Sequence, residues 1–255
     1  PMPNARDGYY AYNRLWLIVG DDTIIASDLL SANWDSIDNE FRVEQGDGTR
    51  LIAIRQFSNG NLIAFKERGI AVLTNANNFV TTSDMAMQFI DDKVGCVAPR
   101  TAVPIGKDIF FLGREGVWTI NQTSEQNAQL VEVPLSEPIY ELIQKINWQS
   151  SETFFAEQYD NYYICGVSVD GSDYPNRILA YDLTSRAWVG YWEYGATPIE
   201  FSLISSIDHL GKTYLMGQTA DAGTMVLMVG DTKDSHASTK GYLAFGLTEV
   251  DFRGL

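Results

Sequence analysis

Two copies of one pattern decide the fold: Asn61-Leu-Ile-Ala-Phe-Lys-Glu-Arg-Gly69-Ile-Ala-Val-Leu-Thr74 and, 47 residues later, Asp108-Ile-Phe-Phe-Leu-Gly-Arg-Glu-Gly116-Val-Trp-Thr-Ile-Asn121. Each copy has an apolar run, a short charged cluster that ends in glycine, and a second apolar run. Such flanks around a glycine that is free to take a positive φ predict a β-hairpin. A hairpin that recurs at about 20–50 residues predicts an array of small sheets.

The same spacing continues on both sides of this stretch. The residues expected to open the second strand of each repeat are separated by steps of 48, 47, 53 and 51 residues. A propeller blade of four short strands takes about 40–50 residues. The sequence therefore predicts an all-β chain, a β-propeller of about five four-stranded blades that forms one domain over residues 1–255, with six blades as the alternative. The five opening residues are Asn13, Asn61, Asp108, Asn161 and Lys212.

The fourth repeat shows the predicted blade most completely. Four runs rich in aromatic and β-branched residues follow one another with turns between them, which is the order of a four-stranded meander. After the fifth repeat, Tyr242–Phe252 is expected to supply a closing strand or to lead into a further part of a longer protein. The four runs are Ser151–Tyr159, Tyr162–Val169, Arg177–Leu183 and Trp188–Trp192.

One short helix is predicted near residues 137–147. Ser136 is the expected N-cap, and Pro138 stands early in the helix, where a missing N–H costs nothing. Four apolar residues at helical spacing form the stripe that would pack on the sheets. They are Ile139, Leu142, Ile143 and Ile146.

Composition and charge exclude some classes of function. The chain has 255 residues, of which 45% are hydrophobic and 20% charged, with a net charge of −15 and a pI near 4.4. Because phosphate binding needs Lys and Arg to displace counterions, such a chain is not expected to read nucleic acid. Apolar runs such as Leu15–Val19 fall far short of the roughly 20 residues of a membrane span. The opening Pro1-Met2-Pro3 suggests a fragment of a longer chain.

The two cysteines, Cys96 and Cys165, lie in different repeats. A disulfide framework would need more cysteines at more regular spacing. Both are therefore predicted to be free, buried thiols, since unpaired cysteine is commonly buried.

No arrangement of residues predicts catalysis, a metal site or a cofactor site, and the chain is not expected to be an enzyme. The sequence has no nucleophile elbow, phosphate-binding glycine loop or zinc-protease motif. His209 and His236 are expected to be surface residues of loops. Asp170-Gly-Ser-Asp173 has the look of half a calcium loop but lacks the spacing and the closing Glu, so a hairpin turn is expected. The adjacent acids are expected to occupy turns; they are Asp21-Asp22, Asp91-Asp92 and the pair Asp38 and Glu40.

Several short motifs occur in an order that resembles a known family. The ordered set resembles the propeller region of bacteriophage tail structural proteins, in particular the nozzle or tail tubular protein B type of short-tailed phages. It covers roughly residues 9–148. The motifs are Asn13-Arg-Leu-Trp16, Ala26-Ser-Asp28, Gly46-Asp-Gly48, Asn61–Ile70, Gly95-Cys-Val-Ala-Pro-Arg100, Asp108–Asn121 and Leu135-Ser-Glu-Pro-Ile139.

The resemblance implies a virion component, made in the host cytoplasm, that assembles as a homo-hexameric ring. Its implied partners are the portal-side adaptor, other tail proteins and tail fibres, and DNA would pass through the ring without sequence-specific binding. The family offers no catalytic residue to transfer. Part of the −15 charge is expected to face the channel, where it would repel phosphate within a Debye length of about 8–10 Å.

Two other kinds of function stay open. A glycan- or peptide-binding propeller would use Trp188, Tyr191 and Trp192 as a stacking platform, although large rings more often pack between blades. A glycosidase propeller would use two of the carboxylates across one cleft.

Overall fold

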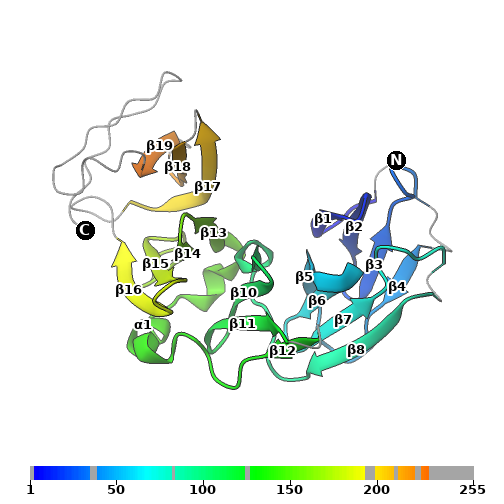
Figure 1. Cartoon of the computed structure of the whole chain (residues 1–255). Helices are drawn as coiled ribbons and strands as arrows, with labels where there is room; N and C mark the ends of the chain where they lie inside the picture. Colours follow the sequence, from blue (N-terminus) through cyan, green and yellow to red (C-terminus); the bar gives the residue numbers. More distant parts are fainter. Residues whose placement is uncertain are drawn as a thin grey trace. The chain divides into compact units, whose positions relative to one another are not determined.

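The computed structural model describes residues 3–34, 39–81, 84–123, 127–192, 199–209, 212–221 and 225–229. The chain divides into two compact units, Pro1–Glu137 and Pro138–Leu255, and each is described by itself. Figure 1 shows that both are built from small antiparallel sheets with little helix.

Three four-stranded sheets make up the first unit. Each is a meander, so strands that are consecutive in sequence are neighbours in the sheet. Sheet 1 contains β1 (Asp7–Ala11), β2 (Arg14–Val19), β3 (Thr23–Ala26) and β4 (Glu40–Arg42); sheet 2 contains β5 (Leu51–Gln56), β6 (Leu62–Lys66), β7 (Ile70–Thr74) and β8 (Ala86–Asp91); sheet 3 contains β9 (Val103–Ile105), β10 (Asp108–Gly113), β11 (Gly116–Gln122) and β12 (Ala128–Leu130). Single 3-10 turns, Ser58–Gly60 and Pro99–Thr101, join strands within and between these sheets.

The repeated pattern forms two equivalent hairpins, as predicted. In β6–β7, Phe65 pairs with Ile70, and in β10–β11, Gly113 pairs with Gly116. Both turn glycines have positive φ, 110° at Gly69 and 132° at Gly116. A Cβ at Gly116 would also lie 1.9 Å from the Ser136 hydroxyl oxygen. The conformation and the lack of space together explain why this turn has glycine.

Two apolar layers hold the three sheets together. The layer between sheets 1 and 2 is centred on Trp16, which is fully buried and whose ring centroid lies 5.5 Å from that of Phe79. The layer between sheets 2 and 3 includes Phe65 and Phe111, with ring centroids 4.9 Å apart. Each buried ring of this kind contributes about 3–5 kcal/mol relative to alanine. Each of the two faces of sheet 2 is therefore covered by a neighbouring sheet.

The second unit has the same construction. One apolar layer lies between sheets 4 and 5, and the Ser206 hydroxyl on β17 donates to Glu157 Oε1 on β13 at 2.7 Å. Sheet 4 contains β13 (Phe155–Tyr159), β14 (Tyr162–Val167), β15 (Arg177–Asp182) and β16 (Ala187–Trp192); sheet 5 contains β17 (Phe201–His209), β18 (Lys212–Thr219) and β19 (Met225–Val229). A 3-10 segment, Trp148–Thr153, precedes β13.

The predicted helix is present but short. A 3-10 turn, Glu137–Ile139, leads into the single α-helical turn α1, Tyr140–Ile143. The predicted stripe faces inward, since Ile143 and Ile146 are buried, but Ile146 already makes a β-bridge to Val169. The helix is short because that bridge requires extended backbone.

The expected N-cap was wrong for α1. Its capping position is Ile139, which makes no side-chain capping bond. The Ser136 hydroxyl instead accepts a hydrogen bond from the backbone N–H of Val117 at 2.9 Å. Ser136 therefore ties the segment before the helix to β11.

The predicted all-β fold of four-stranded repeats is confirmed. The second strand of each sheet begins within one residue of its predicted position, and the described residues give five sheets, four of them complete meanders. The predicted closing strand, Tyr242–Phe252, lies outside the described residues. The observed starts are Arg14, Leu62, Asp108, Tyr162 and Lys212.

Candidate functional site

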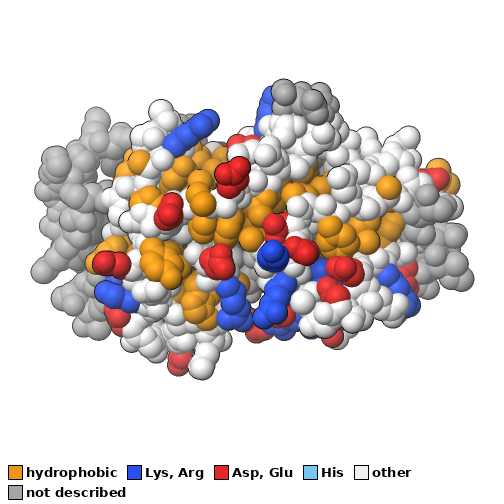
Figure 2. Space-filling view, turned by 90° about the horizontal axis from the view of Figure 1, so that it is seen from below, with side chains coloured by type: hydrophobic (Ala, Val, Ile, Leu, Met, Phe, Trp, Pro, Cys, Tyr) orange, Lys and Arg blue, Asp and Glu red, His pale blue; other side chains and the backbone are white. Residues whose placement is uncertain are grey.

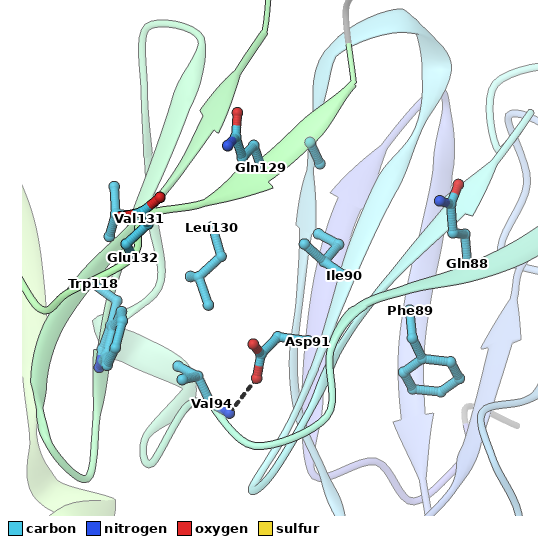
Figure 3. Close-up of a pocket in the computed structure, with 11 residues that line it drawn as sticks. Gln88, Phe89, Ile90, Asp91, Val94, Trp118, Gln129, Leu130, Val131 and Glu132 are labelled. Atoms are coloured by element: carbon cyan, nitrogen blue, oxygen red, sulfur yellow. Dashed lines mark hydrogen bonds between the residues drawn. The ribbon is translucent and has the colours of Figure 1, made fainter.

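A groove lies between the outer strands of sheets 2 and 3 in the first unit. It has a volume of about 460 Å³, within the range of ligand-binding pockets. Figure 3 shows Ile90 and Asp91 of β8 on one side of the space and Leu130 of β12 on the other, whereas the Phe89 ring points away from it. The lining residues are Gln88, Phe89, Ile90, Asp91, Val94, Trp118, Ala128, Gln129, Leu130, Val131 and Glu132.

The floor of the groove is the outer end of the apolar layer between sheets 2 and 3. Ile90, Val94 and Leu130 are half-buried and pack against that layer, which contains the buried Trp118. Three polar residues of the lining are exposed, namely Gln88, Gln129 and Glu132. The groove therefore has an apolar floor and a polar rim, as binding sites commonly have.

Asp91 shapes one end of the groove. Its Oδ1 accepts hydrogen bonds from the backbone N–H groups of Lys93, at 2.7 Å, and Val94, at 2.6 Å. The carbonyl of Val94 then accepts from the N–H of Gly69 at 3.0 Å. Asp91 therefore fixes the bend that follows β8. Its neighbour Asp92 is exposed and does not line the groove.

Buried charges join the sheets elsewhere in the first unit. Lys66 on β6 is fully buried, and its Nζ lies 2.5 Å from Oδ2 of Asp47, in the loop that follows sheet 1. Nζ also donates to the carbonyls of Val43 and Glu44, at 3.4 and 3.3 Å. Burial raises the pKa of Asp47, but hydrogen bonds from Lys66 and Thr49 lower it by more, to about 2.

Arg55 on β5 joins three sheets. Its Nη1 lies 3.1 Å from Oδ2 of Asp7 on β1, and its Nε donates to the Ala102 carbonyl at 2.6 Å, just before β9. Its guanidinium also donates to the Pro99 carbonyl and lies 5.2 Å from the ring centroid of Tyr9. These charges are occupied in holding sheets together, so we assign them no chemistry.

A tyrosine makes a similar joint at the tip of the first hairpin. The Tyr12 hydroxyl donates to the carbonyls of Phe57, at 2.6 Å, and Asn61, at 2.9 Å, which flank the turn between β5 and β6. Burial, together with the neighbouring Tyr9, raises the pKa of Tyr12 to about 12. The hydroxyl therefore stays protonated and keeps its role as a donor.

The two thiols are buried and form no disulfide, as expected. Cys96 and Cys165 are both fully inaccessible to solvent. Burial raises the pKa of the Cys96 thiol, whose Sγ donates to the Ala98 carbonyl at 3.1 Å. A protonated, inaccessible thiol is a poor nucleophile.

The two histidines are not brought to any described site. His209 is the last residue of β17, and His236 lies outside the described residues. Among the residues that the structure describes, no group of three or more His, Cys, Asp or Glu could hold a metal ion.

The described acid pairs occupy turns or short-range pairs. Asp21 and Asp22 lie between β2 and β3; Asp21 forms an ion pair with Arg6 at 3.1 Å, and Asp22 accepts from the Thr23 hydroxyl at 3.0 Å. Glu40 pairs with Arg42 at 3.2 Å on the same strand, while Asp38 lies outside the described residues. The loop Asp170–Asp173 is the predicted hairpin turn between β14 and β15, with φ of 55° and 80° at its first two residues.

The three aromatic residues of β16 do not form one platform. Trp188 pairs with Tyr181, with ring centroids 5.2 Å apart, whereas Trp192 contacts Tyr162 at 6.3 Å on the opposite face of sheet 4. Tyr191 is 49% exposed, with the Arg177 guanidinium 5.5 Å from its ring centroid. Trp188 and Tyr191 therefore share one face of sheet 4, where Tyr191 is the exposed ring, and Trp192 lies on the other face.

Sequence reasoning did not find the groove. Its two sides come from β8 and β12, which belong to different repeats of the chain. Their proximity depends on how sheet 2 packs on sheet 3, and no local sequence pattern predicts that packing. The half-buried Ile90 and Leu130 do not belong to any recognisable binding motif.

Comparison with known proteins supports the fold alone. No family model matches the chain, and no curated protein matches it. The solved structure of dihydro-haem d1 dehydrogenase NirN in complex with DHE has a TM-score of 0.51 at 9% identity, over 88% of this chain and 44% of that one. PorZ, an essential bacterial surface component of the type-IX secretion system of Porphyromonas gingivalis, has a TM-score of 0.45 at 14% identity, over 93% of this chain and 27% of that one.

This chain thus spans less than half the length of either structure. Together with the meander sheets, the likeness to NirN shows a β-propeller-like fold. In the part of the chain that the structure describes, none of the helices has the length and apolar character needed to cross a membrane.

Proposed function

We propose that the chain is the β-propeller region of a structural protein of a bacteriophage tail, part of the ring-shaped nozzle or tail tube through which DNA leaves the virion. In this proposal the protein is not an enzyme. It forms a homo-hexameric ring, joins the portal-side adaptor and other tail proteins, tail fibres among them, and is made in the host cytoplasm.

The observation that carries the proposal is that the motifs of the resemblance form close contacts between successive segments of the chain. Gly95 packs so closely on the preceding β6–β7 hairpin that a Cβ there would lie 2.3 Å from the Lys66 carbonyl oxygen. Asp47, in the Gly46–Gly48 motif, pairs with the buried Lys66, and Gly116 lies against Ser136 of the last motif. These motif residues hold successive segments of the chain together, as expected of a protein with a structural role.

Charge supports the same proposal. A wall with excess carboxylates repels phosphate, so DNA can slide past it without being held. On the face shown in Figure 2, acidic and basic side chains are interspersed among hydrophobic ones, so that face has no patch of a single sign. The proposal places the excess of acids elsewhere, on the wall of the assembled channel.

Electron microscopy of the purified full-length protein tests the proposal. Rings with sixfold symmetry are the expected result, and a monomer at every concentration tested would overturn the hexamer. Neutralising acids that line the ring's lumen should slow DNA ejection while the rings still assemble. If the acidic residues lay only on the outer surface of the ring, the hypothesis that an acidic channel wall lets DNA slide would be wrong.

Binding of a glycan is the second candidate, and one observation favours it. Tyr191 is half-exposed beside Arg177, an arrangement that can stack on a sugar and donate hydrogen bonds to it. A glycan array probed with the wild type and a Tyr191→Ala variant would reveal such a site. Turnover of a chromogenic glycoside would favour the glycosidase reading instead.

A further inference from the structure

The groove between β8 and β12 exposes two strand edges. Each strand is the outermost of its sheet and pairs on one side only among the described strands. Just beyond the two ends of β12, the Val131 N–H donates to the Thr119 carbonyl, and the Asn127 carbonyl accepts from the Thr123 N–H. The odd-numbered residues of this segment therefore point their backbone groups toward β11. The N–H and C=O of Ala128 and Leu130 therefore point the other way, out of sheet 3.

The same reasoning applies to β8. The Lys66 N–H donates to the Gly69 carbonyl, so the odd-numbered residues of β7 point their backbone N–H and C=O groups toward β6 and the even-numbered ones toward β8. Val72 is paired with Gln88, so the backbone groups of Gln88 point toward β7 and those of Phe89 point outward. Unpaired edges of this kind can accept an added strand.

The lining specifies what could fill the groove. The floor is apolar, from Ile90, Leu130 and Val94, and the only charged residues of the lining are the acids Asp91 and Glu132. An extended peptide places alternate side chains on opposite sides, so one set can enter an apolar groove while the other meets the rim. Lys or Arg on the rim side would complement the carboxylates.

We propose that this groove binds an extended peptide segment of another protein, with apolar side chains alternating with Lys or Arg, by adding it as a strand to the edge of β12. Main-chain hydrogen bonds to Ala128 and Leu130 would supply affinity, and the apolar floor would select the inward side chains. The inference stands on the groove itself and does not depend on the tail assignment.

A labelled seven-residue peptide of alternating valine and lysine, acetylated and amidated, is the probe. It should bind the wild-type chain, measured by fluorescence anisotropy, at least about tenfold more tightly than its valine–glutamate counterpart. On binding, hydrogen exchange of the Ala128 and Leu130 amides should slow by at least about tenfold, because a new strand protects them. Equal binding of the two peptides, or binding without that protection, would overturn the proposal.

A pair of variants isolates the backbone contact. Ala128→Pro removes one outward N–H at the first residue of an edge strand, where proline is tolerated, and should weaken binding by about tenfold. Ala128→Gly keeps the N–H and serves as the matched control, so the proline variant should bind about tenfold more weakly than the glycine variant. Equal affinity of the two variants would overturn strand addition.

A third variant keeps the test decisive if the proline variant does not fold. Glu132→Lys reverses a charge on the exposed rim, where the fold is not at stake. It should weaken the valine–lysine peptide by about three- to tenfold and strengthen the valine–glutamate peptide. Unchanged affinities for both peptides would contradict the charge complementarity on which the choice of partner rests.

Discussion

Replacing Asp47 by Asn should destabilise the chain markedly, because it leaves the ammonium of Lys66 buried without a counter-charge. Nζ would keep only neutral acceptors, which are the carbonyls of Val43 and Glu44, at 3.4 and 3.3 Å, and the amide oxygen of the introduced asparagine. Breaking a buried pair typically costs about 3–5 kcal/mol. Since the Asp47 side chain is 23% exposed, water can offset part of this, and we expect a loss of about 2–3 kcal/mol.

The double-mutant cycle sharpens this prediction. Lys66→Met replaces the cation with an apolar chain of similar length and should change stability by less than about 1.5 kcal/mol. In that background, Asp47→Asn should cost less than about 0.5 kcal/mol, which gives a coupling energy of about 2 kcal/mol.

The assay is urea unfolding followed by tryptophan fluorescence, with the midpoint and the slope compared across the four proteins. Hydrogen exchange of the amides of β6 provides a local measurement if unfolding is not two-state. A loss below about 0.5 kcal/mol for Asp47→Asn in the wild-type background, or a coupling energy near zero, would refute the reasoning.

Three further predictions concern the turn at Gly116, the carboxylate of Asp47 and the two buried thiols. Gly116→Ala should cost more than about 2 kcal/mol in urea unfolding, and adding Ser136→Gly should recover only part of it, since the space is restored but φ stays at 132°; full recovery would contradict the backbone argument. The pKa of Asp47 is lowered to about 2, and this contributes stability that is complete above the ordinary value near 3.8 and is lost as pH falls toward 2. The free energy of unfolding should therefore fall over that pH range for the wild type. A wild-type free energy that does not change over the range, or that equals the value of the Asp47→Asn, Lys66→Met double variant at both ends, would exclude this contribution. Native protein should leave Cys96 and Cys165 unreactive toward a thiol reagent, and both should react in concentrated guanidinium; rapid reaction of the native protein would show that these thiols are accessible.

Local patterns predicted the strands well because each sheet is a meander. The turn glycines Gly69 and Gly116, and the polar turn residues near Asn13 and Asn161, mark hairpins whose strands are adjacent in sequence. Period and turn chemistry are enough to find such elements.

The helix shows where local patterns fail. The stripe that includes Ile143 and Ile146 has helical spacing and does face inward, but the backbone of Ile146 is taken by a bridge to Val169. Tertiary pairing overrode the local preference, and Ser136 was similarly drawn to β11. Neither partner is close in sequence, so neither could be read from the segment alone.

The groove and the buried charges escaped prediction for the same reason. Lys66 stands in the charged cluster of a hairpin, where exposure is the usual expectation, and only the packing of sheet 1 beside it brings Asp47 within reach. The groove depends on two outer strands, β8 and β12, about forty residues apart in the chain. Distant packing cannot be inferred from one sequence without knowing how successive sheets meet.

The meander order also bears on how the chain acquires its structure during synthesis. Each strand finds its hairpin partner among residues that have just left the ribosome, so pairing needs no later segment. In the first unit, contacts from sheet 2 reach back to sheet 1, as from Arg55 to Asp7. Within each unit, a later sheet can therefore form on an earlier one that is already in place, with little hydrophobic surface left exposed during synthesis.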